Sequence, residues 1–385
     1  EQQAQQAPQE QQEESSPAVP PCTAASPISM QAETALPRAD AAGTAGGRLL
    51  RTAWVAAAAA ALLLIAVVLG IAIGETDISA HTVFQVLAHQ LLGQPLSAVD
   101  PITQGIVWNY RLPRALVAAS CGAGLAISGV ILQSLLRNAL AEPYLLGISA
   151  GASTGAVAVA LLGFGAGFLT MPAGALIGAF VAFSLVSLLA VRAGHGNSAI
   201  ILAGVAGSQL FNAMTSFIVT KSANAEQARG IMFWLLGNLS GVRWPDVTLA
   251  LPACLIGLAI CLWHARALDA FTFGTESAAS LGIPVRRVYA VLIGVSAMMT
   301  AVMVSIVGSV GFIGLVIPHA ARMVVGVRHG RLLPAAALIG AIFMIVADIL
   351  SRIIIPGQVL PIGVITALFG APAFALLLGQ RRASS

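Results

Sequence analysis

The stretch AWVAAAAAALLLIAVVLGIAI, residues 53–73, is apolar or small at every position. An α-helix needs about 20 predominantly apolar residues to cross the hydrocarbon core of a bilayer. This run has that length, so we predict a membrane-spanning helix here. Comparable runs recur along the rest of the chain.

The composition also indicates a membrane protein. Of the 385 residues, 58% are hydrophobic and 9% are charged, and the mean hydropathy is +0.90. Soluble domains usually carry about 25% charged residues. So few charges cannot cover a water-facing surface of this size, which favours an all-α, polytopic membrane protein. The net charge of +4 comes from arginines between apolar runs, a pattern that orients membrane proteins and does not call for nucleic acid.

About ten membrane-spanning helices are predicted, at residues 53–73, 115–136, 143–162, 168–191, 198–220, 245–263, 288–306, 311–327, 332–351 and 359–379. The segment GSVGFIGLVIPH, residues 308–319, has the glycine and proline interruptions typical of a broken helix. The segments AEPYLLGISAGAS and GFIGLVIPHAARM occupy comparable places in the two halves of the chain and are weakly similar. Internal repeats of this kind are common in transporters.

The chain divides into a tail, residues 1–47, and a membrane domain, residues 48–385. The tail is rich in Gln, Glu and Pro and has few apolar residues, so we predict that it is disordered. Arginines are more numerous in the connections on the side of the tail than in the others. Both termini are therefore predicted to be cytoplasmic.

Three connecting segments are expected to have structure of their own. In the outer connection 74–112, Val83, Leu87 and Leu91 fall on one face of a short helix that we predict to lie along the membrane surface. The cytoplasmic connection 264–287 has a helix-forming stretch that Gly282 and Pro284 end, which suggests a docking surface for a soluble partner.

The third segment, EQARGIMFWLLGNLSG at 226–241, is too short to span the membrane and too apolar to be free in water. We predict a helix tucked into the outer mouth of the protein.

Ser149 lies in Gly-Ile-Ser-Ala-Gly, which matches the G-x-S-x-G pattern of serine hydrolases. That motif needs a strand before the serine and a helix after it, with a histidine and an acid in reach. The surroundings of Ser149 are predicted to be helical throughout. The pattern therefore favours close packing of small residues between helices over an intramembrane serine hydrolase.

Charged residues at the outer ends of the spans have two possible roles. Asp348 and Arg352 are four residues apart and can form a local ion pair, or Arg352 can face a partner. Arg111 and Arg114 can anchor the protein at the membrane interface, or they can also contact a partner.

The predicted spans contain almost no ionisable groups, because Glu142 and Asp348 lie near their ends. An ion-coupled secondary transporter normally needs carboxylates or broken-helix ion sites near the midplane. The energy for transport is therefore expected to come from outside the chain. No metal site is predicted, because the cysteines lack metal-ligand spacing: Cys22, Cys121, Cys254 and Cys261.

Three segments together resemble the FecCD type of permease subunit, found in bacterial ABC importers for iron–siderophores, haem and cobalamin. They are YRLPRALVAASCGAGLAISGVILQSLLRNALAEPYLLGISAGAS at 110–153, GFIGLVIPHAARMV at 311–324 and LPIGVITALFGAPAFALLL at 360–378. The resemblance runs from about residue 50 to the C-terminus, and it departs from the family at Ala139, where proline is frequent.

The resemblance implies a type II importer in the bacterial inner membrane. It implies two copies of the permease, two ATP-binding subunits that use ATP and Mg, and a periplasmic substrate-binding protein. No cofactor is expected on the permease itself, which is expected to be a transport subunit and not an enzyme.

The resemblance also implies roles for particular residues, with the 226–241 helix as an outer gate. The residues expected to dock the binding protein are Arg111, Arg114 and Arg352. Those expected to form the cytoplasmic gate are Asn138, Leu140, Asn197 and Ser198. Those expected to couple to the ATPase are Glu276, Ser277, Leu281, Gly282 and Pro284.

The substrate is expected to be bulky, because a wide pathway lined by small and apolar residues suits a chelate better than a bare ion. A bare ferric ion would call for oxygen-rich ligands, which are not clustered here. His81 and His89 of the outer connection are more simply explained as solvated residues than as haem ligands. We favour an iron chelate, either a ferric siderophore or haem, with cobalamin as the alternative.

Overall fold

The computed structural model describes residues 41–74, 76, 78–95, 99–165, 167–194, 197–222 and 224–382. Residues 1–40 of the predicted tail lie outside the described residues. The first helix begins at Ala41 and so includes residues 41–47, which the sequence analysis placed in the tail. Extending an existing helix is easier than starting one, so the helix of the adjoining apolar run can continue into this stretch.

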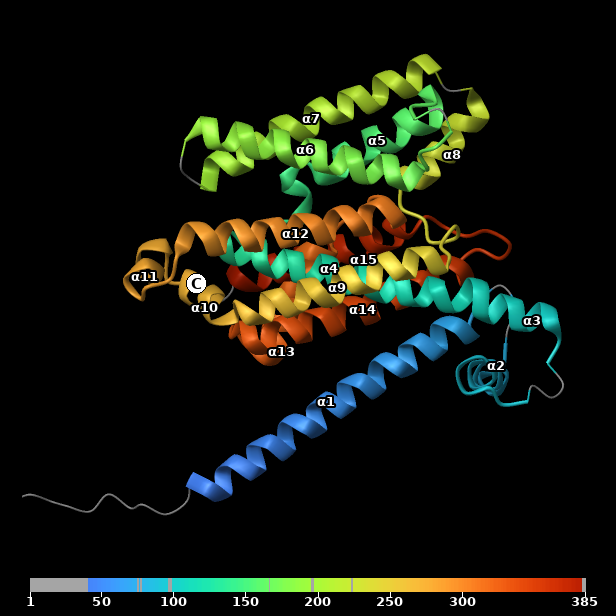
Figure 1. Cartoon of the computed structure of the whole chain (residues 1–385), viewed down its shortest axis with the longest axis horizontal. Coiled ribbons are helices and arrows are strands. Elements are labelled where there is room, and N and C mark those ends of the chain that lie inside the picture. Colours follow the sequence, from blue (N-terminus) through green and yellow to red (C-terminus); the bar gives the residue numbers. More distant parts are fainter. Residues whose placement is uncertain are drawn as a thin grey trace, which may run out of the picture. The chain divides into compact units, whose positions relative to one another are not determined.

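All regular structure in the described residues is helical (Figure 1). The elements are α1 (Ala41–Ala72), α2 (Ala80–Leu92), α3 (Pro101–Gly105), the π-helical turn η1 (Ile106–Arg111), α4 (Leu112–Leu135), the 3₁₀ turn η2 (Pro143–Leu146), α5 (Ile148–Leu162), α6 (Met171–Ala193), α7 (Asn197–Ser222), α8 (Ala225–Leu235), α9 (Trp244–Trp263), α10 (Ala265–Phe271), α11 (Thr275–Ser280), α12 (Val285–Val307), α13 (Ile313–Val325), α14 (His329–Ile353) and α15 (Ile362–Arg382).

Each of the ten predicted spans corresponds to one long or apolar helix. Within the described residues, seven helical segments are long and apolar enough to cross a membrane, and α5, α13 and α15 supply shorter apolar stretches. The predicted break lies at residues 308–312, between α12 and α13. Helix α5 follows the 3₁₀ turn η2, and α13 follows the non-helical residues 308–312, so both α-helices are shorter than the predicted spans.

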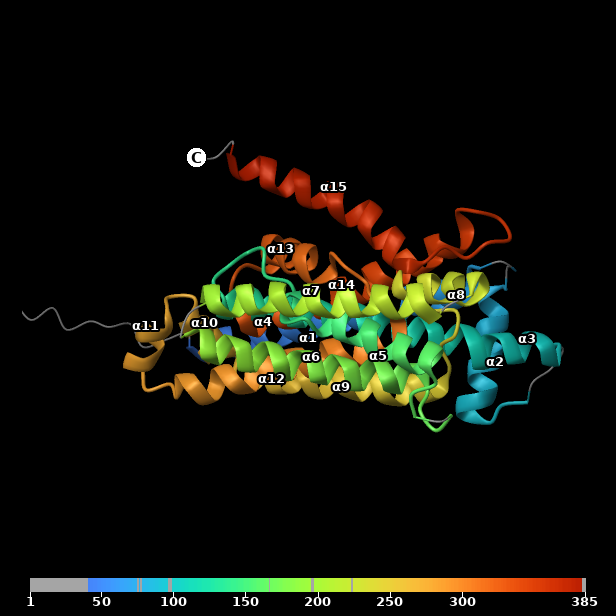
Figure 2. The ribbon, with the colours of Figure 1, turned by 90° about the horizontal axis from the view of Figure 1, so that it is seen from above.

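Helix α4 occupies the centre of the bundle, with α9, α12, α13 and α14 packed around it (Figures 1 and 2). In the 101–135 segment, 89% of the most apolar stretch is buried, compared with 17% in α1. Close packing depends on glycine, because a Cβ added to Gly122 would lie 2.0 Å from the carbonyl oxygen of Gly340 on α14. The backbones of α4 and α14 therefore approach more closely than any larger residue would allow.

Helices α5, α6 and α7 pack together on one side of this core (Figure 1). Here Gly151, the last residue of the G-x-S-x-G pattern, faces Ala182 and the backbone of Gly178 on α6. A Cβ on Gly151 would come within 2.2 Å of the Ala182 methyl group. The structure thus confirms that this pattern serves close helix packing.

The short helices mark the two ends of the bundle. Figure 1 shows α2 and α3 at one end, which we call the α2 end, and α10 and α11 at the other, which we call the coupling-loop end. Helix α2 lies across the direction of the long helices, as predicted for a surface helix. Its buried residues are Val83 and Val86, whereas the predicted Leu91 is 69% exposed, because the helix turns Val86 and not Leu91 toward the bundle.

Candidate functional sites

The α2 end carries three arginines and one aspartate, and two of the arginines contact the end of α1. Arg111 closes the turn η1, and its Nη1 donates hydrogen bonds to the carbonyl oxygens of Ile71 (2.8 Å) and Ala72 (2.9 Å). Its Nη2 donates to the hydroxyl and the carbonyl oxygen of Thr76. Arg111 is therefore only 8% exposed.

Arg352 of α14 completes this arrangement from the other side. Its Nη1 donates to the carbonyl oxygen of Ile73 (2.7 Å) and its Nη2 to that of Gly70 (2.8 Å). The last carbonyl groups of a helix have no partner within the helix and carry partial negative charge. Two guanidinium groups therefore satisfy the C-terminal end of α1.

Asp348 links two of these arginines. One carboxylate oxygen lies 2.8 Å from Nε of Arg114 and the other 3.0 Å from Nη2 of Arg352, and the carboxylate side chain is 3% exposed. The predicted local pair between Asp348 and Arg352 is thus confirmed. Docking of a binding protein by Arg111, Arg114 and Arg352 stays a prediction, and the side chain of Arg114 is the most accessible of the three, at 13%.

The coupling-loop end presents the residues expected to meet an ATPase. All five of them are exposed, whereas Ala278 of α11 is buried and anchors the loop: Glu276, Ser277, Leu281, Gly282 and Pro284. Two large apolar side chains also face outward, with Phe273 79% and Leu281 72% exposed. Gly282 has φ +78°, in the left-handed region that favours glycine.

A polar network that the sequence analysis missed holds this loop to the bundle. The imidazole of His329, at the start of α14, lies between the carboxylate of Asp269 on α10 and the hydroxyl of Ser134 on α4. These residues are 60 and 195 positions from His329 in the sequence. No local spacing pattern could have brought them together.

At the centre of the bundle, the two similar segments, residues 141–153 and 311–323, contact each other. Glu142 accepts a hydrogen bond from the backbone N–H of Phe312 (3.0 Å). The Tyr144 hydroxyl donates to the carbonyl oxygen of Val310 (2.6 Å) and accepts from its N–H (2.8 Å). Side chains from the α4–α5 connection therefore satisfy the backbone of the break at 308–312, as non-helical backbone inside a membrane protein requires.

The backbone of this contact is strained at one residue. Phe312 adopts φ +69°, an unfavourable conformation for a residue with a Cβ. The hydrogen bond from the backbone N–H of Phe312 to the Glu142 carboxylate holds this unfavourable backbone conformation in place.

Ser149 also belongs to this central contact and has no catalytic partners there. Its hydroxyl donates to the hydroxyl of Ser309 (3.0 Å), and the residue is 8% exposed. A hydrogen bond across two helical segments is the role expected for a hydroxyl in close helix packing.

The residues expected at the cytoplasmic gate lie on two elements. Asn138 forms a turn in which its side-chain oxygen accepts from the N–H of Leu140 (2.9 Å), and Leu140 is 53% exposed. Asn197 and Ser198 begin α7, where Ser198 is exposed. The side chain of Asn197 lies outside the described residues, and closure by these four residues stays a prediction.

Helix α8 confirms the predicted short helix, although it ends at Leu235, before the expected residue 241. The loop that follows returns to the bundle, because the N–H of Asn238 donates to the carbonyl oxygen of Val307 (2.7 Å). The backbone of Leu236 in turn accepts from Gly363 of α15 (3.0 Å). Because residues 236–238 turn back toward the bundle, α8 ends at Leu235 and not at residue 241.

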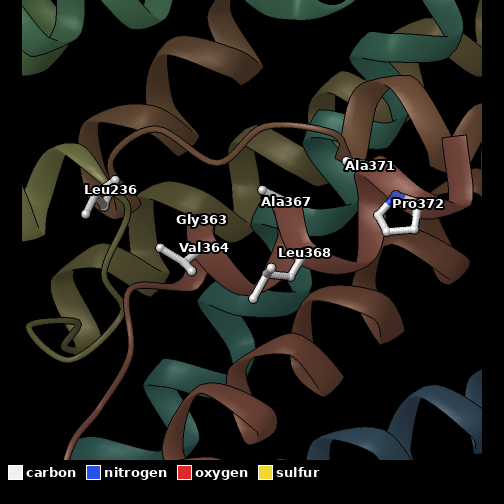
Figure 3. Close-up of a pocket in the computed structure, with 7 residues that line it drawn as sticks. All are labelled: Leu236, Gly363, Val364, Ala367, Leu368, Ala371 and Pro372. Carbon is white, nitrogen blue, oxygen red and sulfur yellow. The ribbon is translucent and has the colours of Figure 1, made fainter. Parts of the chain in front are cut away.

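An open apolar groove lies where this turn meets α15 (Figure 3). Its volume is about 490 Å³. Figure 3 shows Val364, Ala367 and Leu368 along one helix, with Leu236 at the opposite side. The groove is lined by Leu236, Gly363, Val364, Ala367, Leu368, Ala371 and Pro372.

The sequence matches the FecCD transport family over residues 62–380. It is 43% identical over 284 residues to the cobalamin import system permease protein of Halobacterium salinarum, covering 74% of this chain and 76% of that protein. It is 38% identical over 279 residues to the Fe(3+) dicitrate transport system permease protein of Escherichia coli, covering 72% and 86%.

A solved structure has the same fold. It is a metal-chelate type ABC transporter in an inward-facing conformation, with a TM-score of 0.73 and 31% sequence identity over 84% of this chain and 98% of that chain. The ten apolar helices, the central break and the short helices at the two ends together agree with this similarity. The chain belongs to the FecCD transport family and is a multi-pass membrane permease of the ABC importer class.

Proposed function

We propose that this chain is the permease subunit of an ATP-driven importer that carries an iron chelate, a ferric siderophore or haem, across the bacterial inner membrane. The proposal is supported mainly by the coupling loop, residues 264–287, which is fixed to the bundle and exposes apolar side chains. It is anchored to the bundle through Ala278 and Asp269, and it presents Phe273 and Leu281 to the outside. Exposed apolar side chains on a structured loop beyond the membrane helices indicate contact with a soluble partner.

That partner is an ATP-hydrolysing subunit in this proposal, because the two carboxylates at the ends of the predicted spans are both already engaged. The carboxylate of Asp348 is neutralised by two arginines, and that of Glu142 is engaged with the backbone of Phe312. Neither is left to bind a coupling ion. The α2 end would then face the periplasmic binding protein, and both termini would be cytoplasmic.

A second copy of the chain would cover the groove beside α15. The exposed apolar side chains of this helix, Leu368 (63%) and Phe369 (50%), lie on a face that the described residues leave open. Figure 2 shows α15 leaving the bundle toward its C-terminal end, so this face is accessible to a neighbour. A pathway between two such copies would be wide and apolar.

The chemistry of the described residues favours a complexed metal over a free one. They include no group of three or more His, Cys, Asp or Glu side chains that could hold a metal ion. A pathway without such ligands suits a metal already wrapped in an organic chelator. Cobalamin is the second candidate, because a relative at 43% identity is named as a cobalamin permease.

The experiment compares substrates directly. The permease, its partner ATPase and its binding protein are reconstituted in liposomes, and ATP-dependent uptake of a ferric siderophore, haem and cobalamin is measured side by side. The proposal expects uptake of an iron chelate in preference to cobalamin. Preferential uptake of cobalamin would assign the chain to the alternative.

A further inference from the structure

The coupling-loop end of the permease contains a joint between three helices, in which the His329 side chain is 2% exposed and that of Asp269 is 42% exposed. His329 Nδ1 lies 2.7 Å from Oδ1 of Asp269, and His329 Nε2 lies 2.7 Å from the hydroxyl of Ser134. Asp269 belongs to α10 of the coupling loop, His329 to α14 and Ser134 to α4. One imidazole ring thus bridges the coupling loop and two membrane helices.

Asp269 has a second role in this joint. Its Oδ1 also accepts a hydrogen bond from the backbone N–H of His329 (2.8 Å), at the first turn of α14. The N-cap residue of that helix, Arg328, makes no side-chain capping bond. Because a carboxylate at a helix N-terminus satisfies an unpaired N–H and interacts favourably with the helix dipole, Asp269 serves as the cap from another element.

Ser134 allows the joint to persist in either protonation state of the imidazole. Its hydroxyl lies 2.8 Å from the carbonyl oxygen of Val130 as well as 2.7 Å from His329 Nε2. With a neutral ring that donates from Nδ1 to Asp269, the hydroxyl donates to Nε2. With a charged ring, Nε2 donates to the hydroxyl, which donates to Val130 instead.

The order serine, histidine, aspartate is that of a hydrolytic triad, but the surroundings do not suit catalysis. Ser134 is 7% and His329 2% exposed, and Ser134 lies within the last turn of a helix. An attacking hydroxyl must reach a substrate carbonyl group. The buried positions of both residues deny that access.

We propose that His329 is a positioning residue for energy coupling: it fastens α10 to α14 and α4, so that force on the exposed coupling loop moves these helices together. The inference rests on the proposed function of that loop as the ATPase contact. The side chains of Leu268 and Phe271 already bury α10 against the bundle. The joint adds directional contacts, two hydrogen bonds to the Asp269 carboxylate, which hold α10 in one position relative to α14 and α4.

The first test needs only the permease in lipid nanodiscs. Hydrogen exchange of the α10 amides is measured in wild type and in His329→Leu, which removes both ring nitrogens. We expect α10 to exchange roughly tenfold faster, since a bond to a charged group is lost, with α9 unchanged. The matched control is His89→Leu, because that ring bonds the carbonyl oxygen of Gln94 at the opposite end of the protein (2.7 Å) and should leave α10 as in wild type.

Substitutions at Asp269 separate a specific joint from a general packing effect. Asp269→Leu should accelerate exchange at least as much as His329→Leu, because it also removes the acceptor for the backbone N–H of His329. The double variant should be no worse than Asp269→Leu alone. Asp269→Asn keeps an acceptor oxygen and should restore most of the protection. Additive effects of the two leucine variants, or no rescue by asparagine, would overturn the joint.

The second test measures substrate moved per ATP hydrolysed with the partner ATPase present. We expect that ratio to fall several-fold in His329→Leu and to recover in Asp269→Asn relative to Asp269→Leu. A loosened α10 with normal coupling would overturn the coupling role of His329. Absence of ATP-driven uptake in wild type would overturn the proposed function, and the coupling role with it, whereas the exchange data would still report whether the joint exists.

Discussion

Arg352 and Ile73 lie 279 positions apart in the chain, and Arg352 Nη1 donates a 2.7 Å hydrogen bond to the carbonyl oxygen of Ile73. This bond joins the C-terminal end of α14 to the end of α1. Together with Arg111 it supplies the partners that the last carbonyl groups of α1 lack within the helix. Arg352, for which the sequence suggested a surface contact, is thus part of the internal structure.

Removing this arginine should destabilise the protein strongly. Arg352→Leu leaves Asp348 with one partner and the carbonyl oxygens of Gly70 and Ile73 without theirs. Breaking a buried ion pair typically costs about 3–5 kcal/mol, so a clear loss of thermal stability in detergent is expected. The control is Arg229→Leu on the exposed face of α8, where a change within about 0.5 kcal/mol is expected. Equal stability of the two variants would show that the α1 contacts do not matter.

Glu142 should tolerate loss of charge but not loss of its acceptor oxygen. Glu142→Gln can still accept from the N–H of Phe312, so its thermal stability should stay close to that of wild type. Glu142→Leu leaves that N–H unpaired and should cost about 1–3 kcal/mol. A glutamine variant as unstable as the leucine variant would mean that the carboxylate charge itself is required.

Ser149→Ala should change little. The hydroxyl makes one bond to Ser309, worth about 1 kcal/mol or less, and alanine preserves the close approach of the helices. Uptake and folding are therefore expected to remain near wild type, and a serine-directed phosphonate should not label the wild-type protein at this position. Specific labelling of Ser149 would restore the hydrolase hypothesis.

Gly282→Val should uncouple ATP hydrolysis from transport without unfolding the membrane helices. The residue has φ +78° and no atom within 4 Å of an added Cβ, so the effect is conformational and not steric. A β-branched residue in this conformation costs about 1–3 kcal/mol, enough to rearrange the end of α11. Gly105→Val is the control, because Gly105 is helical and equally open. Unchanged coupling in the Gly282 variant would remove this loop from the mechanism.

The sequence was sufficient to predict the ten apolar helices, because the length of an apolar run is a local property that the bilayer thickness fixes. It also predicted a break within residues 308–319, which the structure places at 308–312, and the end of a helix near Gly282, since glycine acts on the backbone at its own position. Helix ends were less accurate: α8 stops at Leu235 because the next residues bond to α12 and α15.

The side-chain networks could not be predicted in the same way. Joining Asp269, Ser134 and His329 requires three elements to pack in one arrangement, and no spacing in the chain encodes it. The outer arginines show the same limit. Their types and positions suggested charge at a surface, whereas tertiary packing turned Arg111 and Arg352 inward onto α1.

The central claim is that this permease imports its substrate with energy from a separate ATPase. The most direct measurement is uptake of a ferric chelate into proteoliposomes that contain the permease and its binding protein, with and without the partner ATPase and ATP. We predict uptake only when both ATPase and ATP are present, with no ATP hydrolysis by the permease alone. Uptake driven by a proton or sodium gradient in the absence of the ATPase would contradict this account.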